Sequence, residues 1–197
     1  MVNGNIVLIG MPGSGKSKLG KQVSKRLGLG FVDLDEFISA QERSTIERLF
    51  REKGEVYFRE IEKKFMKEFL KLHSHVVVLG GGSVVDEGGV EMMNQIGESY
   101  WIDVGIDELK NRMLRNINEI ERRPMFRELL GKDNFENLVV ERLQDLYLAR
   151  RDFYAQANFQ FAVNYGSEDQ VAQMFCKRFL ENSAIKLQEE SATINAE

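Results

Sequence analysis

The chain has 197 residues, which is the size of one ordinary domain. Hydrophobic residues make up 43% and charged residues 29%, a composition that excludes a disordered or fibrous protein. The net charge of −4 gives no broad positive field, so we expect no nucleic-acid or membrane partner. An anionic ligand would have to be held by local basic residues. The single cysteine, Cys176, rules out a disulfide framework, and its apolar surroundings predict a packing role.

Apolar runs of strand length alternate with helical patterns along the chain. Strands are predicted at 5–10, 31–35, 75–82, 99–104 and 159–163, and helices at 17–28, 45–54, 56–72, 87–97, 107–117, 135–157 and 169–182. Strands that are apolar on both faces predict a parallel sheet covered by helices on both sides, an α/β fold. Ligands bind such sheets outside the carboxyl ends of the strands. Three unusual segments should therefore converge there: a glycine-rich loop at 10–15, the pair Asp33 and Asp35, and Gly80–Gly82.

We expect one domain over residues 1–183, followed by a polar, disordered tail at 184–197. The N-terminus leads directly into a strand, without the apolar core of a signal peptide. No apolar run approaches the ~20 residues that cross a bilayer. These features favour a cytoplasmic protein.

The segment GMPGSGKSKLG (10–20) follows the first predicted strand and precedes a helix. Gly10, Gly15, Lys16 and Ser17 fit the phosphate-loop pattern G-x-x-x-x-G-K-[ST], which favours a nucleoside triphosphate over a chance glycine turn. Backbone N–H groups and the positive end of the helix would surround the phosphates. Lys16 would reach the β- and γ-phosphates, and the Ser17 hydroxyl suits Mg²⁺. The candidate ATP-binding residues of this loop are Gly13, Ser14, Gly15, Lys16, Ser17 and Lys18.

A second carboxylate for magnesium is expected from the segment FVDLDEF. Asp33 and Asp35 lie two residues apart, so in an extended chain their side chains share one side. One can hold the metal through water while the other accepts a proton from an attacking hydroxyl. Two alternatives stay open. The pair can simply cap the following helix, and Asp103, at the end of the predicted strand 99–104, is a rival metal carboxylate.

The ordered set of motifs resembles the shikimate kinases over roughly residues 5–180. The segments that carry the resemblance are GMPGSGKSKLG, FVDLDEFI, GEVYFREIE with VVVLGGGSV, and RRPMF followed by RRDFYAQA. The resemblance implies a P-loop kinase fold of the nucleoside monophosphate kinase type. Its five-stranded parallel sheet would have the order 2-3-1-4-5, and a mobile lid would span about 113–130. It also implies a monomer that uses ATP and Mg²⁺ to phosphorylate the 3-hydroxyl of shikimate in aromatic amino acid (chorismate) biosynthesis, giving shikimate 3-phosphate and ADP.

On the acceptor side, the resemblance implies that Asp35 binds shikimate hydroxyls and is the catalytic base. Arg59 and Arg150 would bind the shikimate carboxylate, with Glu62 orienting Arg59. Gly80, Gly81 and Gly82 would offer backbone contacts to the substrate. Arginine suits this role because its planar guanidinium can form two parallel hydrogen bonds to a carboxylate.

On the nucleotide side, the resemblance implies that Asp33 supports Mg²⁺ together with Ser17, and that Lys16 and the lid residue Arg123 act on the ATP phosphates. The lid is about one residue longer than in common family members, so Arg115 is only a candidate nucleotide contact. No arginine follows the last predicted strand, where many members place one against adenine. Backbone and lid residues would then hold the base.

Two other functions remain open from the sequence. One is a P-loop kinase for another small polyol acid such as gluconate, which the pair Arg59 and Arg150 argues against. The other is a nucleotide-binding regulatory module that has lost turnover, which the presence of Lys16, Asp35 and Arg123 argues against.

Overall fold

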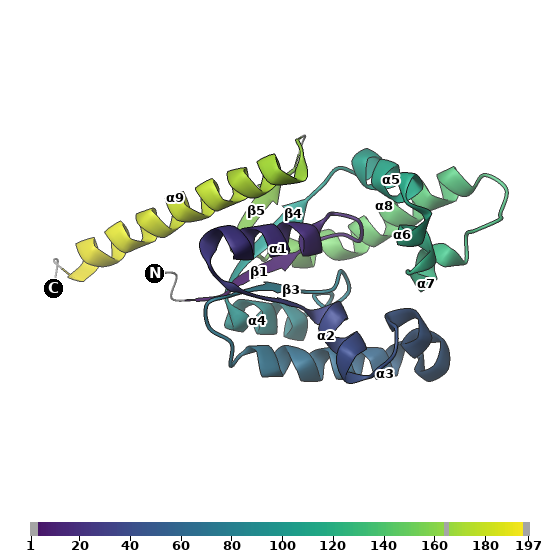
Figure 1. Cartoon of the computed structure of the whole chain (residues 1–197), viewed down its shortest axis with the longest axis horizontal. Coiled ribbons are helices and arrows are strands. Elements are labelled where there is room, and N and C mark those ends of the chain that lie inside the picture. Colours follow the sequence, from purple (N-terminus) through teal and green to yellow (C-terminus); the bar gives the residue numbers. More distant parts are fainter. Residues whose placement is uncertain (1–3, 164–165, 195–197) are drawn as a thin grey trace.

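The structure is a computed structural model of the chain, and it describes residues 4–163 and 166–194 (Figure 1). The strands are β1 (Ile6–Ile9), β2 (Gly30–Asp33), β3 (His75–Val78), β4 (Glu98–Asp103) and β5 (Phe159–Ala162). The helices are α1 (Lys16–Leu27), α2 (Leu34–Gln41), α3 (Ile46–Phe69), α4 (Glu87–Ile96), α5 (Ile106–Arg115), α6 (Ile117–Glu121), α7 (Pro124–Arg127), α8 (Phe135–Tyr154) and α9 (Glu168–Ile194).

The five strands form one parallel sheet in the order β2-β3-β1-β4-β5, which confirms the predicted topology. The central strand β1 is fully buried, because β3 and β4 pair with it on either side. In that register Leu8 lies beside Val78 of β3 and Tyr100 of β4. The carboxyl ends of the central strands therefore meet at one edge of the sheet.

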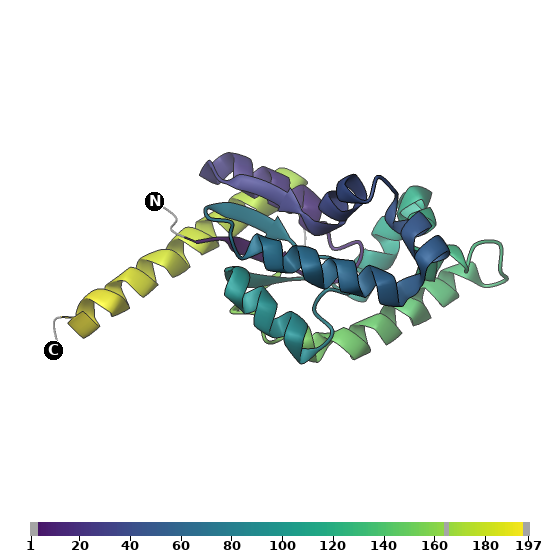
Figure 2. The ribbon, with the colours of Figure 1, turned by 90° about the horizontal axis from the view of Figure 1, so that it is seen from below.

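Helices cover both faces of the sheet, as Figures 1 and 2 show. Consecutive residues of β4 illustrate the two layers, because side chains alternate along a strand. Tyr100 contacts Phe175 of α9, and the neighbouring Trp101 contacts Tyr154 of α8. Helix α1 packs beside α9, whereas α4 contacts both α3 and α8 on the opposite face. Both aromatic side chains of β4 are therefore core residues.

The second strand is shorter than predicted, and this changes the setting of the acidic pair. β2 ends at Asp33, and Leu34 already begins α2. The Asp33 side chain caps this helix by accepting hydrogen bonds from the backbone N–H groups of Asp35 (3.0 Å) and Glu36 (3.3 Å). The expectation that Asp33 and Asp35 share one side of an extended chain is therefore wrong, since Asp35 lies in the first helical turn.

The two helices predicted at 45–54 and 56–72 lie on either side of a kink within α3. Gly54 interrupts it with φ 82° and ψ 171°, a backbone conformation that a residue with a side chain rarely adopts. The kink separates an N-terminal segment near α7 from the longer segment that packs on the core (Figure 1).

The segment expected to be a disordered tail differs from the structure, in which α9 continues as helix through Ile194. The sequence between residues 184 and 194 is rich in Ala, Leu, Lys, Gln and Glu and holds neither Gly nor Pro, so its helix propensity is high. Figure 1 shows this end of α9 extending away from the sheet. Residues 195–197 lie outside the described residues. Among the helices described, none combines the length and apolar character needed to cross a membrane.

Candidate active site

The glycine-rich loop joins β1 to α1 at the carboxyl edge of the sheet. Gly10, Gly13 and Gly15 all have positive φ values, of 144°, 82° and 87°. A Cβ atom on Gly10 would lie 2.5 Å from the carbonyl oxygen of Ile102 on β4, so the loop can pass the sheet edge only as glycine. Gly15 caps α1, and Lys16 is the first helical residue. The backbone amides of this first turn are thus available to an anion.

Lys16 is buried inside this loop. Its ammonium donates to the carbonyl oxygens of Gly10 (2.8 Å) and Met11 (3.0 Å). Burial lowers the pKa of Lys16 to about 8, with the charges of Arg123 and Arg150 acting in the same direction and Asp35 opposing them. Lys16 therefore carries its charge at neutral pH, and it lies where phosphate oxygens would compete for its protons.

Ser17 and Asp33 form a direct pair across the loop. The Ser17 hydroxyl donates to Asp33 Oδ2 at 2.6 Å, while Oδ1 of the same carboxylate caps α2. Asp33 therefore does both things that the sequence left open: it caps a helix and faces Ser17. Hydroxyl and carboxylate oxygens are hard donors of the kind that Mg²⁺ prefers, so this pair fits the predicted metal. The rival Asp103 accepts a hydrogen bond from Gln160 on β5 instead (2.8 Å).

Lys18 and Asp103 are the sequence candidates whose side chains are paired away from the loop. The Lys18 ammonium forms an exposed ion pair with Glu168 of α9 at 2.7 Å. Its backbone amide in the first turn of α1 is the part of the residue that can still face a phosphate.

Asp35 lies in the first turn of α2, beside Gly80 of the second glycine loop. Its side chain is reached by solvent, yet the neighbouring protein partly desolvates the carboxylate. This desolvation, followed by the negative charges of Asp33 and Glu62, raises the pKa of Asp35 to about 6. Lys16 and Arg123 act in the opposite direction. A carboxylate with this pKa is ionised at neutral pH and is a better proton acceptor than an ordinary aspartate.

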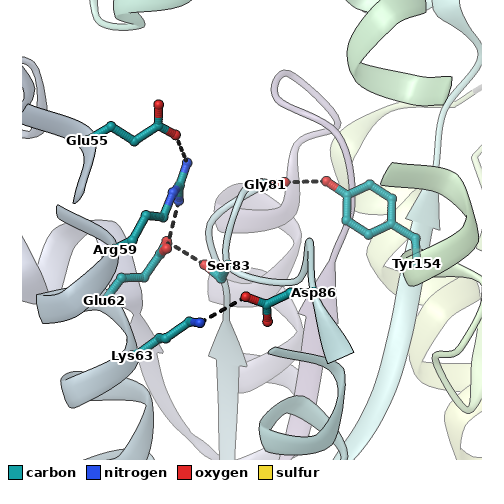
Figure 3. A network of polar contacts seen from close by, with 8 residues as sticks. All are labelled: Glu55, Arg59, Glu62, Lys63, Gly81, Ser83, Asp86 and Tyr154. Atoms are coloured by element: carbon teal, nitrogen blue, oxygen red, sulfur yellow. Dashed lines mark hydrogen bonds and ion pairs between the residues drawn. The ribbon is translucent and has the colours of Figure 1, made fainter. Parts of the chain in front are cut away.

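Arg59 lies on α3 and is held from several sides. Its guanidinium donates to Glu62 Oε2 (2.7 Å) and to Glu55 Oε1 (3.2 Å), as Figure 3 shows. The guanidinium carbon also lies 5.9 Å and 5.5 Å from the ring centres of Phe50 and Phe58. Arg59 and Glu62, three residues apart on one helix, therefore form the ion pair that their spacing predicts.

The loop after β3 fits closely between the two predicted carboxylate-binding arginines. A Cβ atom on Gly82 would lie 2.5 Å from Arg59 Nη2, and one on Gly81 would lie 3.3 Å from Nη1 of the buried Arg150. One on Gly80 would lie 3.0 Å from Asp35 Oδ1. The structure thus brings the three glycines, both arginines and Asp35 to one place. A pocket of about 520 Å³ adjoins Arg59, between the α3 segment 55–63 and the loop 82–86.

The lid segment carries Arg123 directly before Pro124, which begins α7. The Arg123 guanidinium donates to the backbone carbonyl and the carboxylate of Glu119, with 2.7 Å to the carboxylate. Its positive charge acts to lower the pKa values of both Lys16 and Asp35. A further ion pair, between Arg127 and Glu47, joins α7 to the N-terminal segment of α3.

Two residues near the site were missed by reasoning from the sequence. Arg112 of α5 donates to the carbonyl oxygen of Ser14 in the phosphate loop (3.0 Å), whereas the candidate Arg115 is exposed at the end of the same helix. Spacing gave no signal for Arg112, because its local partner Glu108, four residues earlier, makes it look like an ordinary surface pair. The second is Tyr154, whose hydroxyl donates to the carbonyl oxygen of Gly81.

The fold and this site together define a class of protein. A phosphate loop follows β1 of a 2-3-1-4-5 parallel sheet, a serine–aspartate pair lies at its rim, and a second glycine loop lies between two arginines; this is the arrangement of a P-loop kinase for a small molecule. Comparison with known proteins narrows the class. The family model for shikimate kinase matches residues 12–180, and the chain belongs to the shikimate kinase family.

Relatives and solved structures agree with this assignment. The chain is 36% identical over 178 residues to a shikimate kinase of Clostridium botulinum, covering 90% of this chain and 98% of the relative. It is 35% identical over 167 residues to one from Persephonella marina, covering 85% and 93%. It also resembles a structure of the Acinetobacter baumannii shikimate kinase in complex with shikimate, with TM-score 0.78, 28% identity and coverage of 91% and 94%. The corresponding structure from Bacteroides thetaiotaomicron has TM-score 0.78, 28% identity and coverage of 91% and 99%.

Proposed function

We propose that the protein transfers the γ-phosphoryl group of ATP to the 3-hydroxyl of shikimate, giving shikimate 3-phosphate and ADP. This reaction is a step of aromatic amino acid biosynthesis. The observation that carries the proposal is the pairing of Arg59 and Arg150 on either side of the glycine loop, with Asp35 next to the same loop. Such a cleft suits a small acceptor that carries both a carboxylate and hydroxyls.

On the nucleotide side, the loop amides and Lys16 bind the phosphates. The ammonium of Lys16 now donates to loop carbonyls, so phosphate oxygens replace those partners when ATP binds. Arg123 leaves Glu119 and donates to the transferring group, where it stabilises charge that develops during transfer. Closure of the lid excludes water, so that the phosphoryl group is not lost to hydrolysis.

Ser17 and Asp33 hold the magnesium ion of Mg·ATP in this proposal. The pair is supported by its oxygen-only chemistry and by its place at the rim of the phosphate loop. When bound, the ion supplies positive charge that offsets the phosphate charges. Asp33 stays fixed for this task because its second oxygen remains bonded to the backbone of α2.

On the acceptor side, Arg59 and Arg150 bind the carboxylate and orient the ring. Asp35 accepts the proton of the hydroxyl that attacks phosphorus. Its pKa of about 6 keeps it ionised at neutral pH. Gly80, Gly81 and Gly82 let the backbone approach the substrate closely, because a side chain at each would meet a group of the site.

The resemblance to the family supports a monomer as the working unit. We place that monomer in the cytoplasm, where ATP is available as co-substrate.

An ADP-release assay with purified protein tests the proposal against its two rivals. We expect ADP release that depends on shikimate and on Mg²⁺, and little release with gluconate or with no acceptor. Preference for gluconate would make the protein a kinase for another polyol acid. Nucleotide binding without turnover on either acceptor would make it a regulatory module.

A further inference from the structure

The loop between β3 and α4 contacts both arginines of the proposed acceptor site, and among the described residues only Arg59 of the two forms an ion pair. Arg59 is held by Glu62, whose other oxygen accepts a hydrogen bond from Ser83 at 2.6 Å (Figure 3). Arg150 lies across the loop, buried on α8 and against Gly81. The loop is therefore a surface that places its guanidinium.

Tyr154 joins α8 to this loop. It follows Arg150 by one helical turn on α8, and its side chain is completely buried. The Tyr154 hydroxyl donates its proton to the carbonyl oxygen of Gly81 (Figure 3). Gly81 is the glycine at which a Cβ atom would lie 3.3 Å from Arg150 Nη1, so the hydroxyl holds the part of the loop that lies against the guanidinium.

The bond to Gly81 also fixes part of the loop backbone. The carbonyl of Gly81 shares a planar peptide with the N–H of Gly82, and the two point in opposite directions in a trans peptide. Holding the Gly81 carbonyl toward Tyr154 therefore turns the Gly82 N–H away from α8. Glycines permit many backbone conformations, so a single buried hydroxyl removes freedom that the loop would otherwise keep.

We propose that Tyr154 is a positioning residue for the acceptor: its hydroxyl fixes the glycine loop against Arg150, so that the second arginine is aligned to bind the substrate carboxylate. The inference rests on the proposed function. Burial keeps the hydroxyl protonated, because desolvation raises the pKa of Tyr154 against the opposing positive charge of Arg150. The ring alone would satisfy the packing against Trp101 (6.0 Å between ring centres), so packing does not require the oxygen.

The test compares Tyr154→Phe with a matched control, Tyr147→Phe. Tyr147 lies two turns earlier on α8, and its ring also packs against Trp101 (6.3 Å). We expect Tyr154→Phe to raise the KM for shikimate about tenfold, which corresponds to about 1.4 kcal/mol. The KM for ATP and kcat should stay within about twofold of wild type. Tyr147→Phe should change none of these values.

Selectivity distinguishes positioning from a purely structural role. Wild type should prefer shikimate over its uncharged amide, and Tyr154→Phe should lose part of this preference, because its Arg150 is no longer aligned. A second measurement, the rise in melting temperature at a fixed excess of shikimate, should be smaller in Tyr154→Phe than in both other proteins, even if the variant is less stable. An unchanged shikimate KM, selectivity and ligand-induced shift would overturn the inference while leaving the proposed function intact. Absence of shikimate turnover in wild type would overturn the proposed function itself.

Discussion

Removing Arg59 should weaken acceptor binding without affecting the nucleotide. The side chain is 24% exposed and already shares its donors with Glu62 and Glu55, so it is preorganised to meet a carboxylate. Hydrogen bonds to a charged group contribute roughly 1.5–3 kcal/mol. Because each 1.4 kcal/mol is tenfold, Arg59→Ala should raise the shikimate Kd by roughly 10–150-fold.

The alanine variant has a second effect that must be separated from binding. The Glu62 side chain is only 3% exposed. Without Arg59, the Glu62 carboxylate still accepts a hydrogen bond from Ser83, but no positive charge balances it. Breaking a buried ion pair from one side costs about 3–5 kcal/mol of stability. The double variant Arg59→Ala with Glu62→Gln removes the stranded charge. It should recover much of the stability, and none of the shikimate affinity.

Calorimetric titration with shikimate and with its uncharged amide gives the deciding comparison. Wild type should bind the acid much more tightly than the amide, and Arg59→Ala should discriminate much less. Arg59→Lys should restore only part of the shikimate affinity, because an ammonium cannot make the planar two-bond contact. ATP affinity is the internal control and should hardly change. If the folded double variant binds shikimate as tightly as wild type, Arg59 does not bind the carboxylate.

Three further substitutions test other parts of the site. Arg123→Ala should lower kcat by about 10²–10³ with little effect on the KM values, because its target is charge on the transferring group; equal kcat in variant and wild type would rule that role out. Asp35→Asn should abolish turnover and leave Mg·ATP affinity near normal, whereas Asp33→Asn should weaken Mg·ATP binding; the opposite pattern would reverse the two roles. Because the pKa of folded Asp35 is about 6, above that of a free aspartate, its ionisation opposes folding above pH 6. Asp35→Asn should therefore raise the melting temperature at pH 7.5, and this gain should shrink as the pH falls from 6 to 4; a gain that grows on acidification would contradict the raised pKa.

The parts of the fold that follow from local pattern were predictable. The strand before Gly10, the glycines of the loop and the helix from Lys16 are adjacent in sequence, so their meaning does not depend on distant contacts. The strand order was expected from the resemblance to a family, and the structure confirms it. The segment FVDLD was predicted as a strand because apolar residues alternate along it, whereas Asp33 caps a helix that begins at Leu34, one residue before Asp35.

What could not be predicted depends on contacts between segments that are far apart in sequence. Arg112 reaches Ser14 across 98 positions, and Tyr154 reaches Gly81 across 73. Neither contact leaves a periodic signal, and each side chain has an ordinary local explanation on its own helix. The roles assigned to Arg59, Arg150 and Arg123 remain predictions, although the structure places Arg59 and Arg150 against the same glycine loop.

The most direct test of the proposed reaction is analysis of its product by phosphorus NMR after incubation with ATP, Mg²⁺ and shikimate. We expect a single phosphate ester on the 3-hydroxyl, formed in equal amount with ADP. Inorganic phosphate as the main product, or esters spread over several hydroxyls, would contradict a site in which two arginines orient the ring and Asp35 activates one hydroxyl.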